Sequence, residues 1–274
     1  MRMFQYDLSG FYDLHIHPAP DVIARKMTDL QLAEKANAAG MAGFAVKSHV
    51  FPTEGRAAIL RTIYPNLDVL GCIALNLSVG GINPTAVEAA AKMKTKLLWF
   101  PTMDAKAYIK QQGKPGLSVL NEEGNVTEET LTVLQLAKEH DMVVGTGHIG
   151  TEEAMLLAKT AINMGLKRVC MTHVTLTVCQ MSIEQLQQCA EWGVFLEYSY
   201  CHLLSGKCSI EYVVKQIKSV GSKHVILTTD LGQVNNPDPI EGMRAYCQLL
   251  EEHGITRKEI EEMTRDNPRR ILYA

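Results

Sequence analysis

Short apolar runs alternate with helix-like segments along the whole chain, and this alternation constrains the fold more than any other feature. The segments between the runs carry helix-start signals, such as the capping boxes formed by Ser182 with Gln185 and by Thr256 with Glu259. Glycines such as Gly165 stand where a helix would turn back towards the next run. We predict eight strands, at residues 11–17, 43–49, 69–76, 97–102, 142–148, 168–174, 193–200 and 224–231.

Eight strand–helix units in 274 residues predict one α/β domain over residues 1–274, a parallel (β/α)₈ TIM barrel. The alternative is an open doubly wound sheet, which normally carries a glycine-rich phosphate turn after its first strand. The segment after the first strand here contains prolines instead, at Pro18 and Pro20. One connection, residues 103–126, is long, and we predict that it forms a lid with a small hairpin of residues 117–120 and 124–126.

The composition indicates an ordinary globular protein. The sequence is 46% hydrophobic and 21% charged, with a net charge of −3. It has no basic stretch with interleaved aromatics and no apolar run of roughly 20 residues, so we expect neither nucleic acid nor a membrane as partner. The seven cysteines form no CxxC pair, and the N-terminus shows no signal-peptide pattern. We therefore expect reduced thiols, a cytoplasmic location and a small-molecule substrate; self-association would be usual for such a barrel.

Histidines gather at the carboxyl ends of the predicted strands, which converge at one mouth of a barrel. His15 and His17 end the first strand and share one face of it. Imidazole and carboxylate ligands suit zinc, and also manganese, iron or nickel. We therefore predict a divalent metal site, most readily Zn²⁺. The candidate ligands that end predicted strands are His15, His17, His49, His148, His173 and Asp230.

This pattern resembles the amidohydrolase superfamily of metal-dependent barrel hydrolases. The shared features are His-x-His ending the first strand, single histidines ending the fifth and sixth, and an aspartate ending the eighth. The similarity extends from His15 to the tail at residues 266–272. The resemblance implies that His15, His17 and His148 bind the metal. It also implies that His173 is a ligand or an acid/base group beside it, and that Asp230 both contacts metal and moves protons.

One departure concerns the fourth strand, where two-metal members of that superfamily carry a bridging lysine or glutamate. Residues 97–102 contain neither, whereas Lys47 and His49 end the second strand on one shared face. Lys47 could be carboxylated and bridge two ions, or stay protonated and bind a substrate carboxylate, which is the alternative we favour. We therefore expect a divergent member of the superfamily with one or two ions.

The resulting hypothesis is a metal-dependent hydrolase that cleaves a C–N or C–O bond of a small polar molecule: an amide, lactam, lactone or deaminated ring. Asp230 would transfer the proton and His173 would polarise the reacting oxygen, with Lys47 as a third catalytic residue. A mononuclear decarboxylase or hydro-lyase on the same scaffold is the alternative, followed by a phosphoesterase and by a barrel without turnover. The expected substrate-binding residues are Lys47, His49, Asn76 and Thr102.

Three further polar residues lie close to these strand ends. Glu197 falls within the seventh strand, where the sequence leaves open whether it faces the barrel interior or a helix. Strict alternation places Asp13 on the same side as His15, deeper in the barrel. His202 follows the seventh strand and could reach the mouth, although we favour a solvated loop histidine.

Overall fold

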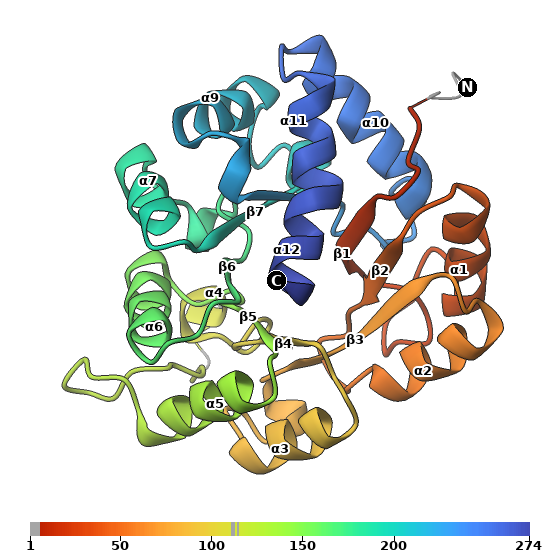
Figure 1. The fold of residues 1–274 in the computed structure, drawn as a ribbon. Coiled ribbons are helices and arrows are strands. Elements are labelled where there is room, and N and C mark those ends of the chain that lie inside the picture. Colours follow the sequence, from red (N-terminus) through yellow and green to blue (C-terminus); the bar gives the residue numbers. More distant parts are fainter. Residues whose placement is uncertain (1–5, 111–112, 114) are drawn as a thin grey trace.

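A computed structural model describes residues 6–110, 113 and 115–274. Its eight parallel strands form one sheet in which each strand pairs with the next along the chain, so the predicted (β/α)₈ barrel is confirmed (Figure 1). Each strand overlaps the run predicted for it. The strands are β1 (Tyr12–Ile16), β2 (Gly43–Val46), β3 (Asp68–Ala74), β4 (Leu97–Trp99), β5 (Val143–Gly145), β6 (Val169–Met171), β7 (Phe195–Ser199) and β8 (Val225–Thr228).

Helices follow the strands and surround the barrel (Figure 1). The predicted capping boxes are present. The side chains of Ser182 and Thr256 each accept a hydrogen bond from the backbone N–H three residues on, and the side chain of that later residue accepts one from the backbone N–H of Ser182 or Thr256. The helices are α1 (Asp29–Ala38), α2 (Glu54–Ile63), α3 (Pro84–Lys92), α4 (Lys106–Ile109), α5 (Glu128–Glu139), α6 (Thr151–Asn163), α7 (Ile183–Glu191), α8 (Tyr200–Leu204), α9 (Ile210–Val220), α10 (Pro239–Glu252), α11 (Arg257–Glu261) and α12 (Asn267–Tyr273).

The barrel closes where its first and last strands meet. The backbone N–H of His17 donates to the carbonyl of Leu231 at 2.8 Å, and that of Asp230 donates to the carbonyl of His15 at 2.9 Å. Beside these bonds, the Asp13 carboxylate accepts hydrogen bonds from the Thr229 backbone N–H at 3.1 Å and from its hydroxyl at 2.6 Å. Closure therefore brings His15 and Asp230 side by side, although they lie near opposite ends of the chain.

A β-bulge in β1 decides which side chains enter the barrel. Tyr12 and Leu14 pack in the apolar cluster inside the barrel, whereas Ile16 packs in the cluster between strands and helices. The pairing register with β2 shifts between Asp13 and Ile16, and this extra residue reverses the alternation. His15 therefore joins Leu14 on the inner side, and the expectation that Asp13 shares that side is wrong, because its carboxylate is bound at the β1–β8 seam.

The opposite end of the barrel is covered by α12, which lies across the barrel axis in Figure 1. Ile271 and Leu272 of this helix pack into the interior cluster. Arg168, just before β6, donates to the Ile271 carbonyl at 2.8 Å and pairs with Asp141. The mouth formed by the carboxyl ends of the strands is therefore the end that can receive a ligand.

The long connection at residues 103–126 borders this mouth. Met103 and Tyr108 of this segment line the cleft there. The predicted hairpin is reduced to a single antiparallel bridge between Leu120 and Val126. Glu153 of α6 holds the segment, because its Oε1 accepts hydrogen bonds from the Ser118 hydroxyl and the Val119 N–H, each at 2.6 Å. The segment's position suits a lid, and its movement stays a prediction.

Two further expectations concern the cysteines and membranes. All seven cysteines are free thiols, and several fill apolar clusters, as expected; Cys72 and Cys170 do so inside the barrel. Among the helices of the described residues, none is both long and apolar enough to cross a bilayer.

Candidate metal centre

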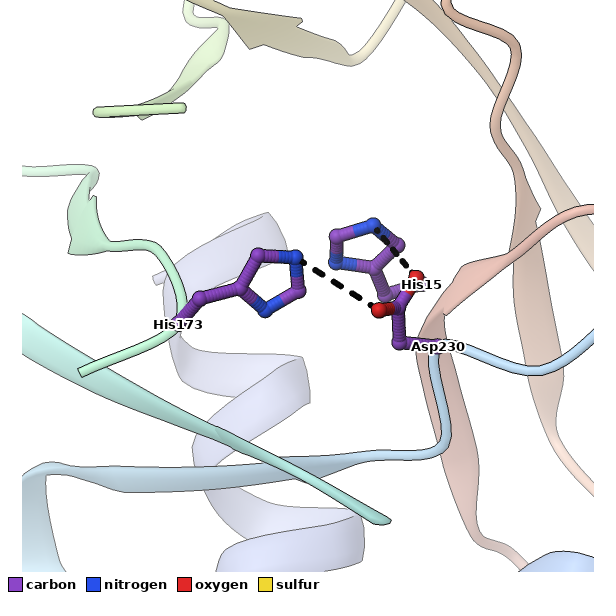
Figure 2. A group of neighbouring side chains, drawn as sticks. All are labelled: His15, His173 and Asp230. Atoms are coloured by element: carbon purple, nitrogen blue, oxygen red, sulfur yellow. Dashed lines mark ion pairs between the residues drawn. The ribbon is translucent and has the colours of Figure 1, made fainter. Parts of the chain in front are cut away.

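Three of the predicted metal ligands converge at the mouth of the barrel. One ligand atom from each of His15, His173 and Asp230 lies within 4.8 Å of the other two. The Nε2 atom of His15 is 3.3 Å from Asp230 Oδ1, and Nε2 of His173 is 3.7 Å from Asp230 Oδ2. Figure 2 shows both imidazoles directed at this carboxylate. The arrangement offers two nitrogen donors and one oxygen donor to a cation.

The other two ligands that the resemblance predicts border the same cluster. His17 Nε2 is 3.1 Å from Asp230 Oδ1, and the ring of His148 is centred 5.4 Å from that of His173. Within the described part of the chain, both ring nitrogens of His148 and Nδ1 of His17 are buried without a hydrogen-bond partner. Because buried polar atoms are normally paired, the orphaned His148 nitrogens fit a site that receives a metal ion or a ligand.

Glu197 orients two of the histidines. The alternation of β7, with Phe195 in the interior cluster, places Glu197 inside the barrel. Its Oε1 lies 3.0 Å from His15 Nδ1 and 2.8 Å from His173 Nδ1. His15 Nδ1 donates to this carboxylate. The hydrogen-bond partner of His173 Nδ1 is the Ser199 hydroxyl at 2.9 Å, which itself donates to Glu197 Oε1 at 3.1 Å. A ring that donates its Nδ1–H in this way keeps the Nε2 lone pair for a metal, which is the usual arrangement around ligating histidines. Glu197 is thus a site residue whose role the sequence left open.

The protonation states also suit a cation. Burial, and then the charge of Lys47, lowers the pKa of His15 to about 3. Burial likewise holds the pKa of His148 well below its ordinary value. For Asp230, burial raises the pKa, but the imidazoles of His15 and His173 outweigh it and hold the pKa well below normal. Neutral imidazoles at His15 and His148 and an ionised carboxylate at Asp230 are the forms that bind metal.

Lys47 lies inside the barrel next to this cluster. Its Nζ is 2.7 Å from His15 Nε2 and 4.5 Å from the ring centre of Trp99, and the side chain is fully buried. Burial lowers the pKa of this amine to about 8. Lys47 and a metal ion would therefore both have access to the same His15 nitrogen. The end of β4 beneath it offers Trp99 rather than a lysine or glutamate, as the sequence indicated.

The four expected substrate-binding residues separate into one that lines the cleft and three that do not. His49 lines it, as do His17 and His148, whereas Lys47 is fully buried and absent from the lining. Asn76 and Thr102 are buried and are absent from the cleft wall. The Asn76 amide instead bonds the His49 carbonyl and the Thr102 hydroxyl, which joins the ends of β2, β3 and β4.

His202 is a site residue that the sequence interpretation missed. It is buried in α8, its Nδ1 is 2.8 Å from the Thr175 hydroxyl, and its ring meets His173 edge-on at 4.8 Å. The interpretation as a solvated loop residue is therefore wrong, because α8 begins directly at the end of β7 and turns His202 inward. The histidine's position one turn past a strand end was the available signal.

Two of the cluster residues have left-handed backbones. His173 and Asp230 adopt φ angles of 56° and 51°, a region that residues other than glycine seldom enter and in which asparagine, aspartate and histidine are the commonest exceptions. Such conformations persist where surrounding structure enforces them, and they concentrate at functional sites.

The cluster opens into a cleft of about 330 Å³, a size suited to a small molecule. It is lined by polar groups, the histidines and Asp230, and by the apolar side chains of Ile23, Met103 and Leu176, of which Ile23 and Met103 are exposed. Lys207 adds a cation to this lining. The cleft can therefore hold a small molecule with a polar end at the histidines.

Comparison with known proteins identifies the family. A model described as a family of unknown function (DUF6282) matches residues 10–197. The chain belongs to this family. The matched region spans β1 to β7, with Glu197 and the four histidines that the resemblance places at the metal, and ends before Asp230. No curated protein matches the sequence.

Solved structures share the fold of this DUF6282 member. An amidohydrolase from Pseudomonas aeruginosa is 14% identical, with a TM-score of 0.67 over 96% of this chain and 95% of that one. A TatD homolog from Escherichia coli K12 is 17% identical, with a TM-score of 0.63 over 97% and 99%. A 2,6-dihydroxybenzoate decarboxylase from Rhizobium is 11% identical, with a TM-score of 0.61 over 96% and 98%. The resemblance to the amidohydrolase superfamily is confirmed at the level of the fold.

Proposed function

We propose that the protein is a metal-dependent hydrolase that cleaves a C–N or C–O bond of a small polar molecule. The observation that carries this proposal is that one Glu197 oxygen lies within 3.0 Å of both His15 Nδ1 and His173 Nδ1, while both Nε2 atoms face Asp230. A cluster of buried imidazoles with a purely structural role would not require both Nε2 atoms to face the same carboxylate. The shared fold with an amidohydrolase adds support.

The ion would be held by His15, His17, His173 and Asp230, with His148 as a further donor. Zinc suits this donor set, although manganese, iron and nickel accept the same ligands. A divalent ion supplies Lewis acidity and makes water a nucleophile at neutral pH.

The protein's own residues would then manage the protons. Asp230 is ionised at neutral pH, since the imidazoles beside it hold its pKa low. Its carboxylate can accept a proton from the attacking water and return it to the leaving nitrogen or oxygen, a contribution of typically 10²–10⁴-fold.

Lys47 favours one second candidate, a mononuclear decarboxylase or hydro-lyase. Among the described residues, no carboxylate lies within 4.0 Å of its Nζ, although the side chain is fully buried. A buried ammonium without an ion-pair partner can receive a substrate carboxylate. The Rhizobium decarboxylase shows that this fold also serves decarboxylation.

The test begins with purified protein stripped by a chelator and reloaded with zinc, manganese, iron or nickel. Bound metal is measured by elemental analysis, and turnover is measured on amides, lactams, lactones, aminated rings, aryl carboxylates and phosphate esters. We expect about one ion per chain, retained in Lys47→Ala, and hydrolysis that Asp230→Asn slows by about 10²–10⁴-fold. Two ions, one of them lost in Lys47→Ala, would indicate a carboxylated bridging lysine. Release of CO₂ without hydrolysis would support the second candidate, and failure to bind metal would refute both.

A further inference from the structure

Asn76 fixes the direction of a short hydrogen-bond relay at the edge of the cleft. Its Oδ1 accepts the backbone N–H groups of Thr102 at 2.9 Å and Asp104 at 3.2 Å. Because two N–H donors must face the oxygen of the amide, its Nδ2 is the group that donates to the Thr102 hydroxyl, at 2.7 Å. The orientation of the Asn76 side chain is thereby determined.

The next member of the relay is the hydroxyl of Thr102, which is fully buried. Within the described chain its Oγ1 has two partners, Asn76 Nδ2 and, at 2.8 Å, His49 Nδ1. Since it accepts from Asn76, its own hydrogen is free to go to His49. The reverse arrangement would leave a buried hydroxyl hydrogen without an acceptor, which is costly. His49 Nδ1 is therefore an acceptor.

A neutral imidazole with an acceptor at Nδ1 carries its hydrogen on Nε2. His49 lines the cleft and stacks on His17 with ring centres 4.7 Å apart. Its Nε2 makes no hydrogen bond within the described residues and is not among the buried orphaned atoms. This N–H therefore belongs to the cleft, and in this tautomer Nε2 has no lone pair for a metal.

We propose that His49 donates its Nε2–H to a carbonyl or carboxylate oxygen of the bound molecule, and that Asn76 and Thr102 are positioning residues that hold this tautomer. The inference rests on the proposed function only in that the cleft must bind a small molecule. It separates His49 from the neighbouring histidines that face Asp230: His49 recognises the ligand's oxygen, whereas those residues hold the metal.

The tautomer can be tested without any turnover. Protein with ¹⁵N-labelled histidine, measured both without metal and with zinc, gives two-bond ¹H–¹⁵N correlations, and His49→Gln identifies the His49 signals by their loss. We expect the pattern of an Nε2–H imidazole in the wild type and mixed tautomers in Thr102→Val, which removes the hydroxyl with little change of shape. An Nδ1–H pattern, or one typical of a metal-bound Nε2, would overturn the proposal whether or not the protein is a hydrolase.

The donor role is tested with benzoate, whose carboxylate supplies the oxygen and whose ring suits the apolar part of the lining. Benzoate affinity of the zinc-loaded protein is compared among wild type, His49→Gln and His49→Leu. Glutamine offers an amide N–H at similar reach, so we expect affinity within about threefold of wild type, against a loss of about tenfold or more in His49→Leu. Equal losses in both variants, no loss in either, or no benzoate binding to the wild type would contradict the donor role.

Discussion

Glu197 Oε1 lies 3.0 Å from His15 Nδ1, across a sequence separation of 182 residues, and the same oxygen reaches His173 Nδ1. Replacing it with the amide in Glu197→Gln leaves one oxygen and adds an NH₂ group, which cannot accept a hydrogen bond. We expect zinc affinity to fall about 10- to 100-fold, as for other partners of ligating histidines. Competition with a chromophoric chelator measures this loss. Glu184→Gln, on the exposed start of α7, is the control and should leave affinity unchanged.

Asp230 combines a chemical role with a left-handed backbone, and two substitutions separate them. Asparagine tolerates this conformation, so Asp230→Asn should keep the free energy of unfolding within about 1 kcal/mol of wild type. It should lower kcat by about 10²–10⁴-fold, because the ionised carboxylate is lost. Asp230→Ala should add a backbone cost of about 1–2 kcal/mol. Urea unfolding and steady-state kinetics measure the two effects; equal activity of Asp230→Asn and wild type would refute the proton-transfer role.

The Glu153 carboxylate is the tether of the segment at residues 103–126. In Glu153→Ala the Ser118 hydroxyl and the Val119 N–H lose their acceptor, so the segment should open more often. We expect faster proteolytic cleavage within the segment and a higher KM, with little change in the global unfolding midpoint. The neighbouring Glu152→Ala is the matched control, since the one side-chain hydrogen bond of Glu152 among the described residues is with Gln185 of α7. Unchanged proteolysis in Glu153→Ala would contradict the tether.

Far from the mouth, the pairing of Asp141 with Arg168 and Lys96 should make a pH-dependent contribution to the free energy of unfolding. Burial raises the pKa of Asp141, but Arg168 and Lys96 outweigh this and lower it below the ordinary 3.8. Because the folded pKa lies below the unfolded one, the stabilisation is present above about pH 4 and is lost as pH falls through the folded pKa. Asp141→Asn keeps the left-handed φ of 55°. The substitution should lower the free energy of unfolding by about 1 kcal/mol or less at pH 7, since the carboxylate is largely exposed. The difference in urea unfolding midpoint between wild type and Asp141→Asn should vanish near pH 2. A difference that stays constant with pH would refute the role of the Asp141 charge.

The strand–helix order was readable because each strand is a short apolar run bounded by helix-start and glycine signals. The convergence of His15, His173 and Asp230 followed from the barrel, since parallel strands end at one mouth. Those inferences needed the positions of residues along the chain, and no detail of side-chain direction.

Side-chain direction was harder to predict for physical reasons. Barrel strands are buried on both sides, so their residues show little polar alternation, and Glu197 could not be assigned a face. The bulge in β1 reversed the alternation at Asp13 without any sequence mark. The burial of Asn76 and Thr102 depended on contacts among three loops, which no local pattern encodes.

Because β1 and β8 meet at the seam, a bound metal would also affect stability. His15 ends β1, His17 follows it and Asp230 follows β8, so an ion bound to all three would cross-link the first and last strands of the barrel. Saturating zinc at a hundredfold excess over its dissociation constant should then raise the unfolding free energy by about 2.7 kcal/mol. Amide hydrogen exchange should slow most in β1 and β8, so the ion that serves the cleft would also stabilise the closed barrel.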